Sequence, residues 1–213
     1  ETVQMESLRS SEDVNALASI IVYDKKGNAD ALRLWWLMRL YGHTKIAVLD
    51  GGQPAWSLAG FPLSAEVIEP MPSSFRFSED SLHHELLATS ATIKDVIADS
   101  SFILLDTRSA EEFSGVKHKK GALVPGHIPG SINLDWAHAV NYGGDFCFKS
   151  PEDLTTMFIN LGITPSHNII VYCHSGVRSS HTTFVLREIL GYPHVTNYDG
   201  SWIEWSHRVD STQ

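Results

Sequence analysis

The sequence predicts an α/β fold, in which a mainly parallel sheet carries helices on both faces. The first observation is a pair of short apolar runs, SIIVY at 19–23 and NIIVY at 168–172, which are typical of buried strands. Second, each run ends in a polar loop that contains glycine, and a segment of helical composition follows the loop. Third, another apolar run closes each unit. Strands that alternate with helices favour a parallel sheet, because parallel strands need a crossover connection.

The predicted elements of the first unit lie within residues 1–60. Strand 19–23 leads through the loop DKKGNAD to a predicted helix at 31–42, ALRLWWLMRLYG. A second strand, KIAVL at 45–49, ends at DGG. The next segment, 61–87, contains three prolines among scattered Ser and Glu, and it is predicted to be an extended linker.

The second unit is predicted to occupy 88–213. It opens with a helix in ATIKDVIAD, and a strand, FILLD at 102–106, comes next. A short helix from Ala110 and the turn-rich segment PGHIPGSINL follow. The strand NIIVY then leads through the loop CHSGVRS to the helical segment SHTTFVLREILG and a last strand, HVTNY at 194–198.

An internal repeat relates the two units at a constant offset of 149 residues. Among the residues that coincide without a gap, six are Gly, Asp or aromatic. The offset pairs Tyr23 with Tyr172, Gly27 with Gly176, Gly42 with Gly191, Asp50 with Asp199, Gly51 with Gly200 and Trp56 with Trp205. We interpret this regularity as a duplication of one structural unit.

The repeat also indicates that the first copy is incomplete. In the second unit, the strand that ends at Asp106 lies 67 residues before Cys173. The corresponding point of the first unit falls before residue 1. A half-domain of this kind leaves parallel sheet surface unpaired. We therefore expect an upstream segment or a partner chain to complete the first unit, and the residues leave both open.

Composition argues against several classes of function. The net charge is -9 and the isoelectric point is near 5.6, so neither nucleic acid nor a membrane is expected as a partner. No apolar stretch approaches the roughly 18 residues of a membrane span, and the start has no signal pattern. No cluster with metal-ligand spacing occurs, and His83 and His84 are interpreted as a solvated surface pair.

The cysteine count favours a reducing compartment. Only two cysteines, Cys147 and Cys173, occur in 213 residues, which is not typical of a disulfide-stapled secreted protein. We therefore expect a cytoplasmic protein. A mitochondrial location stays open, because a removed targeting peptide would leave no trace.

Cys173 is the candidate nucleophile. It directly follows an apolar strand, and the loop CHSGVRS leads into a helix. Backbone N–H groups of a tight loop, the free N–H groups of a first helical turn and the helix dipole together form a positive site. Arg178 adds a permanent positive charge, and Gly176 permits backbone conformations that other residues resist. Such surroundings favour a reactive thiolate over a thiol.

A structural role is the alternative for each cysteine. Free cysteine is among the most buried residue types, so a thiol at a strand end can simply fill the core. The sequence HSGVRS after Cys173 favours the reactive interpretation. Cys147, in DFCFKS, has no such surroundings and is predicted to be structural.

Four ordered motifs resemble a known family. LLDTRSAEEFSG, GHIPGSINL, IIVYCHSGVRSS and LGYPHVTNYDGSWIEW are similar to the active domain of two-domain rhodaneses, the thiosulfate and 3-mercaptopyruvate sulfurtransferases. The segment from IIVYDKKG to VLDGGQPAW resembles the latter half of their inactive N-terminal domain. The resemblance implies two rhodanese-like domains, the first of them incomplete. Asp24 stands at the position equivalent to Cys173 and cannot carry a persulfide, so the first copy is expected to be inactive.

The resemblance implies sulfur transfer through a Cys173 persulfide, with no cofactor and no metal. The partners would be a small anionic sulfur donor, such as thiosulfate, and cyanide or a thiol as acceptor. The resemblance gives the site residues as follows. The loop His174, Ser175, Gly176, Val177, Arg178 and Ser179 would bind the substrate, and Asp106 and Arg108 would support it.

Individual roles follow from the same resemblance. Asp106 matches an acid that braces the loop, and Arg108 can reach either Asp106 or the substrate. Arg178 would hold the anionic donor, whereas His127 is interpreted as a turn-stabilising residue. Glu112 stands where many members have a substrate-binding arginine, and an acid cannot bind an anion there.

The donor and the reaction class each have an alternative. Mercaptopyruvate-using members have a glycine after the cysteine and Ser or Thr in place of Arg178, so His174 and Arg178 favour thiosulfate. A related fold serves phosphatases that place Arg six residues after Cys. Here the spacing is five, and the shorter loop suits one sulfur atom better than a phosphoryl group. A non-enzymatic interaction module is a further alternative.

Overall fold

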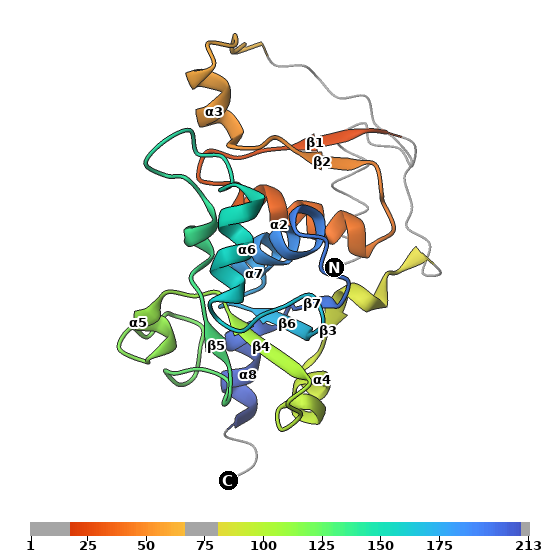
Figure 1. The fold of residues 1–213 in the computed structure, drawn as a ribbon, viewed down its shortest axis with the longest axis vertical. Coiled ribbons are helices and arrows are strands. Elements are labelled where there is room, and N and C mark those ends of the chain that lie inside the picture. The colour runs from red at the N-terminus through yellow and green to blue at the C-terminus, as the bar shows by residue number, and fades with distance from the viewer. Residues whose placement is uncertain (1–17, 67–80, 210–213) are drawn as a thin grey trace.

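The second unit is built on one parallel sheet with its central strand directly before Cys173. The structure is a computed structural model that describes residues 18–66 and 81–209. The strand order is β3 (Leu87–Ala88), β7 (Val195–Tyr198), β6 (Asn168–Tyr172), β4 (Phe102–Asp106) and β5 (Ile132–Asn133). Every pairing in this sheet is parallel (Figure 1).

Helices connect these strands, as crossovers between parallel strands require. The α-helices are α4 (Ser90–Val96), α5 (Ala110–Phe113), α6 (Pro151–Ile159), α7 (Val177–Phe184) and α8 (Ser201–Val209). Shorter turns lie at His84–Leu86 and Trp136–Ala139, and α7 continues as a π-helical turn over Val185–Ile189. Within 18–66 and 81–209, no helix is both long and apolar enough to cross a membrane.

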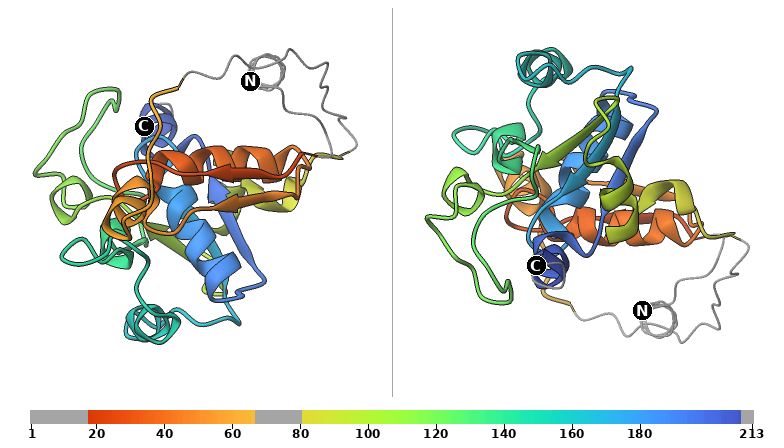
Figure 2. Two further views of the ribbon diagram at one scale, coloured as in Figure 1. Left: turned by 90° about the horizontal axis from the view of Figure 1, so that it is seen from above. Right: turned by 90° about the horizontal axis from the view of Figure 1, so that it is seen from below.

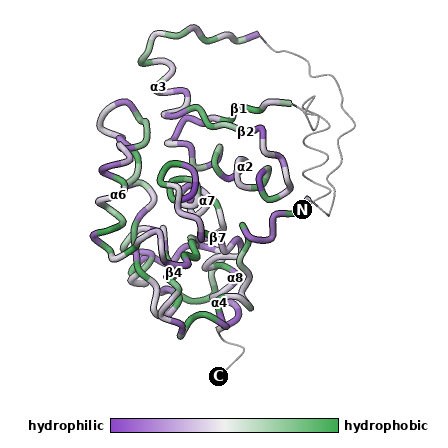
Figure 3. The backbone as a smooth tube through the Cα atoms, turned by 45° about the vertical axis from the view of Figure 1, so that its right-hand side comes forward, coloured by the Kyte–Doolittle hydropathy of each residue, from purple (hydrophilic) through white to green (hydrophobic). Residues whose placement is uncertain are grey.

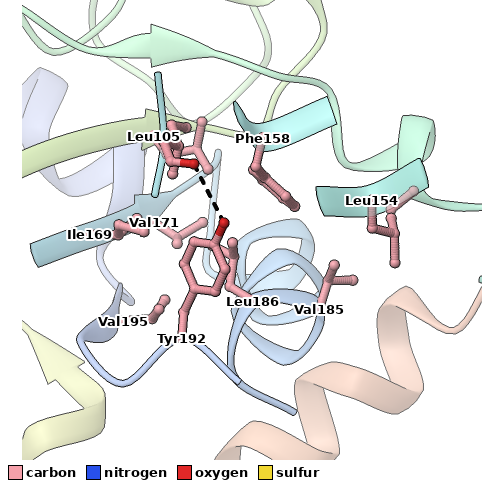
Figure 4. Packing of buried hydrophobic residues seen from close by; sticks show 11 residues of the cluster. Leu105, Leu154, Phe158, Ile169, Val171, Val185, Leu186, Tyr192 and Val195 are labelled. Atoms are coloured by element: carbon pink, nitrogen blue, oxygen red, sulfur yellow. Dashed lines mark hydrogen bonds between the residues drawn. The ribbon is translucent and has the colours of Figure 1, made fainter. Parts of the chain in front are cut away.

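The two faces of the sheet carry separate hydrophobic cores. Side chains alternate along β6, because successive residues of a strand point to opposite faces. Ile169 and Val171 pack with residues of α6 and of the π-helical turn, including Phe158 and Leu186 (Figure 4). The β6 residues that alternate with these two point to the opposite face of the sheet. They pack with residues of α4 and α8 in a second cluster. Helices therefore cover both faces of the sheet, as predicted.

The first unit repeats part of this arrangement. It consists of β1 (Ile20–Val22), α2 (Ala29–Leu40), β2 (Ile46–Val48) and α3 (Gly52–Leu58). β1 and β2 pair in parallel, and Ile20 lies opposite Ile46. The 149-residue offset maps this pair onto Ile169 and Val195, which lie opposite each other in the second unit. The strand register thus agrees with the duplication inferred from the sequence.

Helix α2 joins the two units. It lies between the β1–β2 pair and α7 (Figures 1 and 2). The Trp35 ring meets the Phe184 ring edge to face, with centroids 4.9 Å apart. The Arg33 guanidinium forms a salt bridge with Asp199, at the end of β7. Aromatic packing and an ion pair therefore fix the first unit against the helix that follows Cys173.

One face of the first unit is exposed where its counterpart is buried. Ile21 and Tyr23 are 67% and 58% exposed, whereas Ile170 and Tyr172 at the equivalent positions are 2% and 0% exposed. The segment after α3 adds further exposed apolar side chains, and it is green along the edge of the molecule in Figure 3. The described part of the first unit thus shows no counterpart of β4 and β5, in agreement with an incomplete copy.

Most predicted elements are present, with shifts at their ends. The helix predicted at 31–42 covers 29–40, and the helical segment expected after Ser179 already begins at Val177. The predicted linker 61–87 ends in a 3₁₀ turn and the first residue of β3. An edge strand of two residues is too short to leave a pattern in the sequence. Two of the linker's three prolines lie outside the described residues.

Candidate functional site

Cys173 lies at the carboxyl end of the central strand. Ligands of open parallel sheets bind outside the carboxyl ends of the strands, where the connecting loops meet. Cys173 follows β6 directly and is 1% exposed. Its backbone N–H donates to Ser201 Oγ at 3.1 Å, and its carbonyl accepts from the N–H of Trp202 at 3.0 Å. The start of α8 therefore fixes the backbone on which the thiol stands.

The loop after Cys173 turns sharply at Gly176. Gly176 has a φ of 83°, a left-handed conformation that disfavours any residue with a Cβ. A Cβ at this position would also collide with the Asp199 carboxylate and the Arg33 guanidinium. The Gly176 N–H donates to Ser201 Oγ at 3.2 Å, and the Ser201 hydroxyl donates to the Tyr198 carbonyl at 2.8 Å. One hydroxyl thus ties both ends of the loop to β7.

The first turn of α7 directs polar groups at the sulfur. The Ser179 hydroxyl donates to Cys173 Sγ at 3.6 Å, and both residues are buried. First-turn N–H groups have no partner within their own helix. The carbonyls of Cys173 and His174, which precede this turn, accept instead from Trp202 and Ile203. The loop backbone is thus held by α8, and the first-turn N–H groups of α7 are of the kind that bind an anion.

The first unit holds an anion in the corresponding loop. The Asp24 carboxylate stands at the position of Cys173 and accepts backbone N–H groups of the loop that follows it. Its donors are Lys26 at 2.7 Å, Asn28 at 2.8 Å, Asp30 at 3.0 Å and Ala31 at 3.3 Å. The Asp24 carbonyl accepts from Gln53 N at 3.0 Å, which the repeat maps onto the bond between Cys173 and Trp202. The two loops therefore share a hydrogen-bond pattern.

This correspondence indicates which N–H groups of the second unit surround the sulfur. The offset of 149 residues maps Lys26, Asn28 and Asp30 onto Ser175, Val177 and Ser179. All three lie in the loop that the sequence predicts to bind the substrate. In the first unit the equivalent amides bind a carboxylate. Such charge-assisted hydrogen bonds are about twice as strong as neutral ones.

Arg178 is paired with a buried acid. Its Nη1 donates to Glu112 Oε2 at 2.6 Å, and its Nη2 donates to Glu112 Oε1 at 2.9 Å. Burial by itself would raise the pKa of Glu112, but the hydrogen bonds and charge of Arg178, with Lys119 nearby, lower it to about 2. Burial by itself would lower the pKa of Arg178, but the hydrogen bonds to Glu112 and the electrostatic interactions with Cys173 and Glu112 raise it. Arg178, expected to hold the donor, is thus already bound to an acid.

Arg108 reaches Asp106 and not the sulfur. Its Nε lies 3.0 Å from both Asp106 carboxylate oxygens, and its Nη2 donates to Asp106 Oδ2 at 2.6 Å and to the Gly126 carbonyl at 2.7 Å. The guanidinium also stacks over Trp202, 5.0 Å from the ring centroid. Of the two partners that the sequence leaves open, Asp106 is the one that the structure shows bonded to Arg108.

The resemblance implies that Asp106 braces the 173–179 loop, but the Asp106 carboxylate bonds to Arg108 instead. In the part of the chain that the structure describes, its carboxylate bonds to Arg108, which holds the turn at Gly126. The next residue makes the link to β6, because Thr107 N and Oγ1 both donate to the Tyr172 carbonyl, at 2.9 and 3.1 Å. Asp106 therefore supports the neighbouring turn, and Thr107 supports the strand before the loop.

The His174 side chain turns to a neighbouring loop. Its Nε2 lies 3.0 Å from the Lys120 carbonyl, in the exposed basic segment Lys117–Lys120. Burial lowers the pKa of His174, so the ring favours its neutral form. The His174 ring therefore anchors the loop to its neighbour through Nε2, while its buried Nδ1 has no hydrogen-bond partner among the described residues.

The other singled-out residues lie apart from the sulfur or have local partners. His127 stacks on Phe113 and contacts its carbonyl through Nδ1 at 2.8 Å, as a turn-stabilising residue does. His83 pairs with Glu85. Cys147 is half-buried beside Gly51, and burial raises the pKa of its thiol. The described residues hold no group of three or more side chains suited to a metal ion.

Sequence reasoning missed Ser201 and the partner of Arg178. Ser201 is fully buried and has a φ of 52°, which is rare for a residue other than glycine. The repeat could have indicated this unusual backbone conformation, because the residue equivalent to Ser201 is Gly52, which has a φ of 57°. The pairing of Glu112 with Arg178 joins residues 66 positions apart, and no local pattern encodes it.

Comparison with known proteins places the chain in a family. The model of the rhodanese-like domain matches residues 3–59 and 89–208. The chain belongs to the rhodanese-like family. The two matched segments correspond to the two units of the repeat, and the site around Cys173 lies in the second. This rhodanese-like chain is also similar along nearly its whole length to curated proteins.

Two of these relatives illustrate the similarity. A Mycobacterium bovis protein named "Putative thiosulfate sulfurtransferase 1" is 38% identical, and the match covers 97% of this chain and 74% of that protein. The "Sulfur carrier protein TtuD" of Thermus thermophilus is also 38% identical, over 96% of this chain and 72% of that protein.

Solved structures show the same fold at lower identity. A complex of EanB with ergothioneine superimposes with a TM-score of 0.88 at 22% identity, over 97% of this chain and 53% of that one. The anaerobic ergothioneine biosynthesis enzyme of Chlorobium limicola, bound to trimethyl histidine, gives a TM-score of 0.83 at 23% identity. The chain thus spans about half the length of these structures, and the likeness concerns the fold.

Proposed function

We propose that this rhodanese-like chain is a sulfurtransferase that moves sulfane sulfur from thiosulfate to cyanide or a thiol, as a persulfide on Cys173. The observation that carries the proposal is the anion in the first unit. There the loop amides bind the Asp24 carboxylate at 2.7–3.3 Å, and the same loop in the second unit surrounds a thiol. A loop built to bind an anion supports both the thiolate and the persulfide that follows it.

The proposed first step is a displacement at sulfur. The Cys173 thiolate attacks the outer sulfur of thiosulfate, a new S–S bond forms, and the old S–S bond breaks. Its electron pair leaves with sulfite, so the charge is the same before and after the step. The enzyme is left with a persulfide anion, whose terminal sulfur the loop amides and the Ser179 hydroxyl can reach.

The second step returns the enzyme to its starting state. Cyanide attacks the terminal sulfur and forms the S–C bond of thiocyanate. A thiolate acceptor instead forms the S–S bond of a new persulfide. The Cys173 thiolate leaves with the electron pair of the S–S bond. Covalent catalysis of this kind gives ping-pong kinetics, since each donor product leaves before the acceptor reacts. The steps as written use neither a metal nor a cofactor.

The names of the curated relatives support this proposal. The mycobacterial protein is named for thiosulfate sulfur transfer and the Thermus protein for sulfur carriage. Both roles need a residue that holds sulfur covalently and releases it. Cys173 in its loop meets that requirement, whereas Cys147 is flanked by the acidic residues Asp50 and Asp145, which disfavour a thiolate.

Mass spectrometry of the intact protein tests the proposal. After incubation with thiosulfate, we expect the mass to rise by one sulfur atom, and cyanide should remove the gain and yield thiocyanate. Cys173→Ser should show no gain, whereas the control Cys147→Ser should behave like the parent. An unchanged mass in the parent protein would overturn the proposal and favour a non-catalytic interaction module.

The same assay separates the remaining alternatives. Faster loading from 3-mercaptopyruvate than from thiosulfate, with pyruvate released, would assign the other donor. Hydrolysis of p-nitrophenyl phosphate without any sulfur adduct would assign a phosphatase. We expect neither, because Arg178 is held by Glu112 and the loop places it only five residues after Cys173.

A further inference from the structure

A buried ion pair stands beside the proposed sulfur site. Arg178 lies in the first turn of α7, and Glu112 lies in α5, on the connection that follows β4. Their two hydrogen bonds, of 2.6 and 2.9 Å, use both terminal nitrogens of the guanidinium and both oxygens of the carboxylate. The side chains are 17% and 5% exposed. An ion pair so closely shielded from water interacts strongly and is little screened by salt.

The pair changes the charge that a donor meets. A guanidinium alone presents one full positive charge to an anion, and its carboxylate partner cancels that charge at distances longer than the pair itself. Glu112 keeps its negative charge over the working range, since its pKa is about 2. Lys119 also acts on this acid, but its side chain is exposed, so its effect is weak.

Arg178 keeps donors for a ligand even while it is paired. A guanidinium has five N–H groups, and Glu112 accepts two of them. Arg178 lies in the helix turn that follows the Cys173 loop, and an electrostatic interaction with Cys173 contributes to the raised pKa of Arg178. The sulfonate oxygens of a donor can therefore meet guanidinium N–H groups without meeting a net charge.

We propose that Glu112 controls which donor charge the site prefers. By neutralising Arg178, it weakens the preference of the Cys173 site for a dianionic donor over a monoanionic donor that carries the same transferable sulfur. This proposal rests on the sulfurtransferase function proposed above. It assigns Glu112 to specificity, as a residue that acts through Arg178. The chain would then use singly charged sulfane donors better than a site whose arginine has no acidic partner.

Two donors of matched chemistry separate charge from reactivity. Thiosulfate carries two negative charges, and methanethiosulfonate carries one, with a methyl group in place of one sulfonate oxygen. Each transfers its outer sulfur to the Cys173 thiolate by the same displacement. The first releases sulfite and the second releases methanesulfinate, each with the electron pair of the broken S–S bond. The ratio of their kcat/KM values therefore reports how strongly the site favours the second charge.

The test is this ratio in Glu112→Gln, which keeps the size and one hydrogen-bond acceptor. One added unit of positive charge at a partly buried site is expected to raise the thiosulfate to methanethiosulfonate ratio about tenfold. The matched control is Glu111→Gln, which removes the same charge from an exposed neighbour on α5 and should leave the ratio unchanged. General damage to the fold would lower both rates together and would not move the ratio.

A second pair of variants keeps the test decisive if Glu112→Gln folds poorly. Arg178→Gln leaves Glu112 uncompensated and should lower the ratio about tenfold, because the site then carries a net negative charge. The double variant Glu112→Gln, Arg178→Gln restores neutrality and should return the ratio toward that of the parent. A ratio that stays constant across all the variants would overturn the proposal.

The outcome is distinguishable from a failure of the proposed function. If the parent protein gains sulfur from either donor, the sulfurtransferase function stands, whatever the ratio does. If it gains none from both, the function fails first. An intact persulfide adduct together with an unchanged ratio would therefore refute the specificity role of Glu112 alone.

Discussion

Asp24 and Cys173 occupy equivalent positions in the two copies, and they are the residues that distinguish the two loops chemically. Each stands directly after a strand. Each carbonyl accepts the N–H of the second residue of the helix beyond the next strand, which is Gln53 in α3 or Trp202 in α8. In one copy the loop amides bind a permanent carboxylate, which satisfies them. In the other they face the thiol that we propose gains and loses sulfur. One side chain thus decides whether the same loop is a structural anchor or a reaction site.

Ser201 links Cys173 and Gly176 to β7, so its hydroxyl should matter for both stability and sulfur loading. Ser201→Ala leaves two buried N–H groups without an acceptor, which costs about 1–3 kcal/mol of unfolding free energy. Urea denaturation measures the loss, and the mass assay should show slower loading. Ser57→Ala, at an exposed position on α3, is the control and should leave both unchanged. Equal stability of the two variants would refute this account of Ser201.

His181 predicts how stability depends on pH. Its ring lies between Trp136 and Phe148 at the junction with the first unit. Burial lowers the pKa of His181 to about 3, although Asp24 and Gly27 nearby favour the protonated form. Between about pH 6.5 and 3, the unfolded chain binds a proton that the folded chain does not, so stability falls as pH falls.

The size of this effect can be measured by comparison. From pH 7 to pH 5, His181 should remove about 2 kcal/mol from the free energy of unfolding. His181→Gln has no titrating ring and should lack this part of the pH dependence, whatever its stability at pH 7. Urea titrations of both proteins at the two pH values give the comparison. Parallel losses in both would contradict the assignment.

At the scale of elements, the loop between β6 and α7 depends on the helix of the other unit. Gly176→Ala meets two obstacles: the left-handed backbone and the collision with Asp199 and Arg33. Gly162→Ala is the matched control, since Gly162 has a φ of 75° but nothing within 4 Å of a Cβ. We expect the control to lose about 1 kcal/mol. Gly176→Ala should lose more and should also load sulfur at least tenfold more slowly, because its loop must shift.

Sequence patterns predicted the long elements well and the tertiary contacts poorly. β4 and β6 appear at the predicted residues, because buried central strands are continuous apolar runs. The two-residue strands β3 and β5 carry no such pattern. Cys173 and its loop could be singled out because nucleophile, glycine and arginine are adjacent in sequence. The pairing of Arg178 with Glu112 depends on how α5 folds back onto α7, which local pattern does not encode.

At the scale of the whole molecule, the exposed apolar face of the first unit needs a cover. We propose that an upstream segment or a partner chain provides it, as β4, β5 and their helices do in the second unit. Without that cover, Ile21→Thr should change the free energy of unfolding by less than about 0.5 kcal/mol. The equivalent Ile170→Thr should cost about 2–4 kcal/mol, because Ile170 is buried in the core.

Chemical denaturation of the two variants checks this contrast, and light scattering gives a second readout. Ile21→Thr removes apolar surface from an exposed strand, so it should also reduce self-association of the chain. Similar, large losses in both variants would show that residue 21 is covered in solution. In that case, the light-scattering result would tell a cover within the chain from a second copy of the chain.

The near-complete burial of Cys173 has a consequence for the lifetime of the proposed persulfide. Only 1% of this residue meets solvent, so a bulky thiol that collides with the surface cannot strip the cargo as hydrogen sulfide. Release requires a slender nucleophile, such as cyanide, or a thiol carried at the tip of a narrow projection. If the chain carries sulfur as proposed, the shape of the acceptor, and not its concentration, would determine which molecule receives the sulfur.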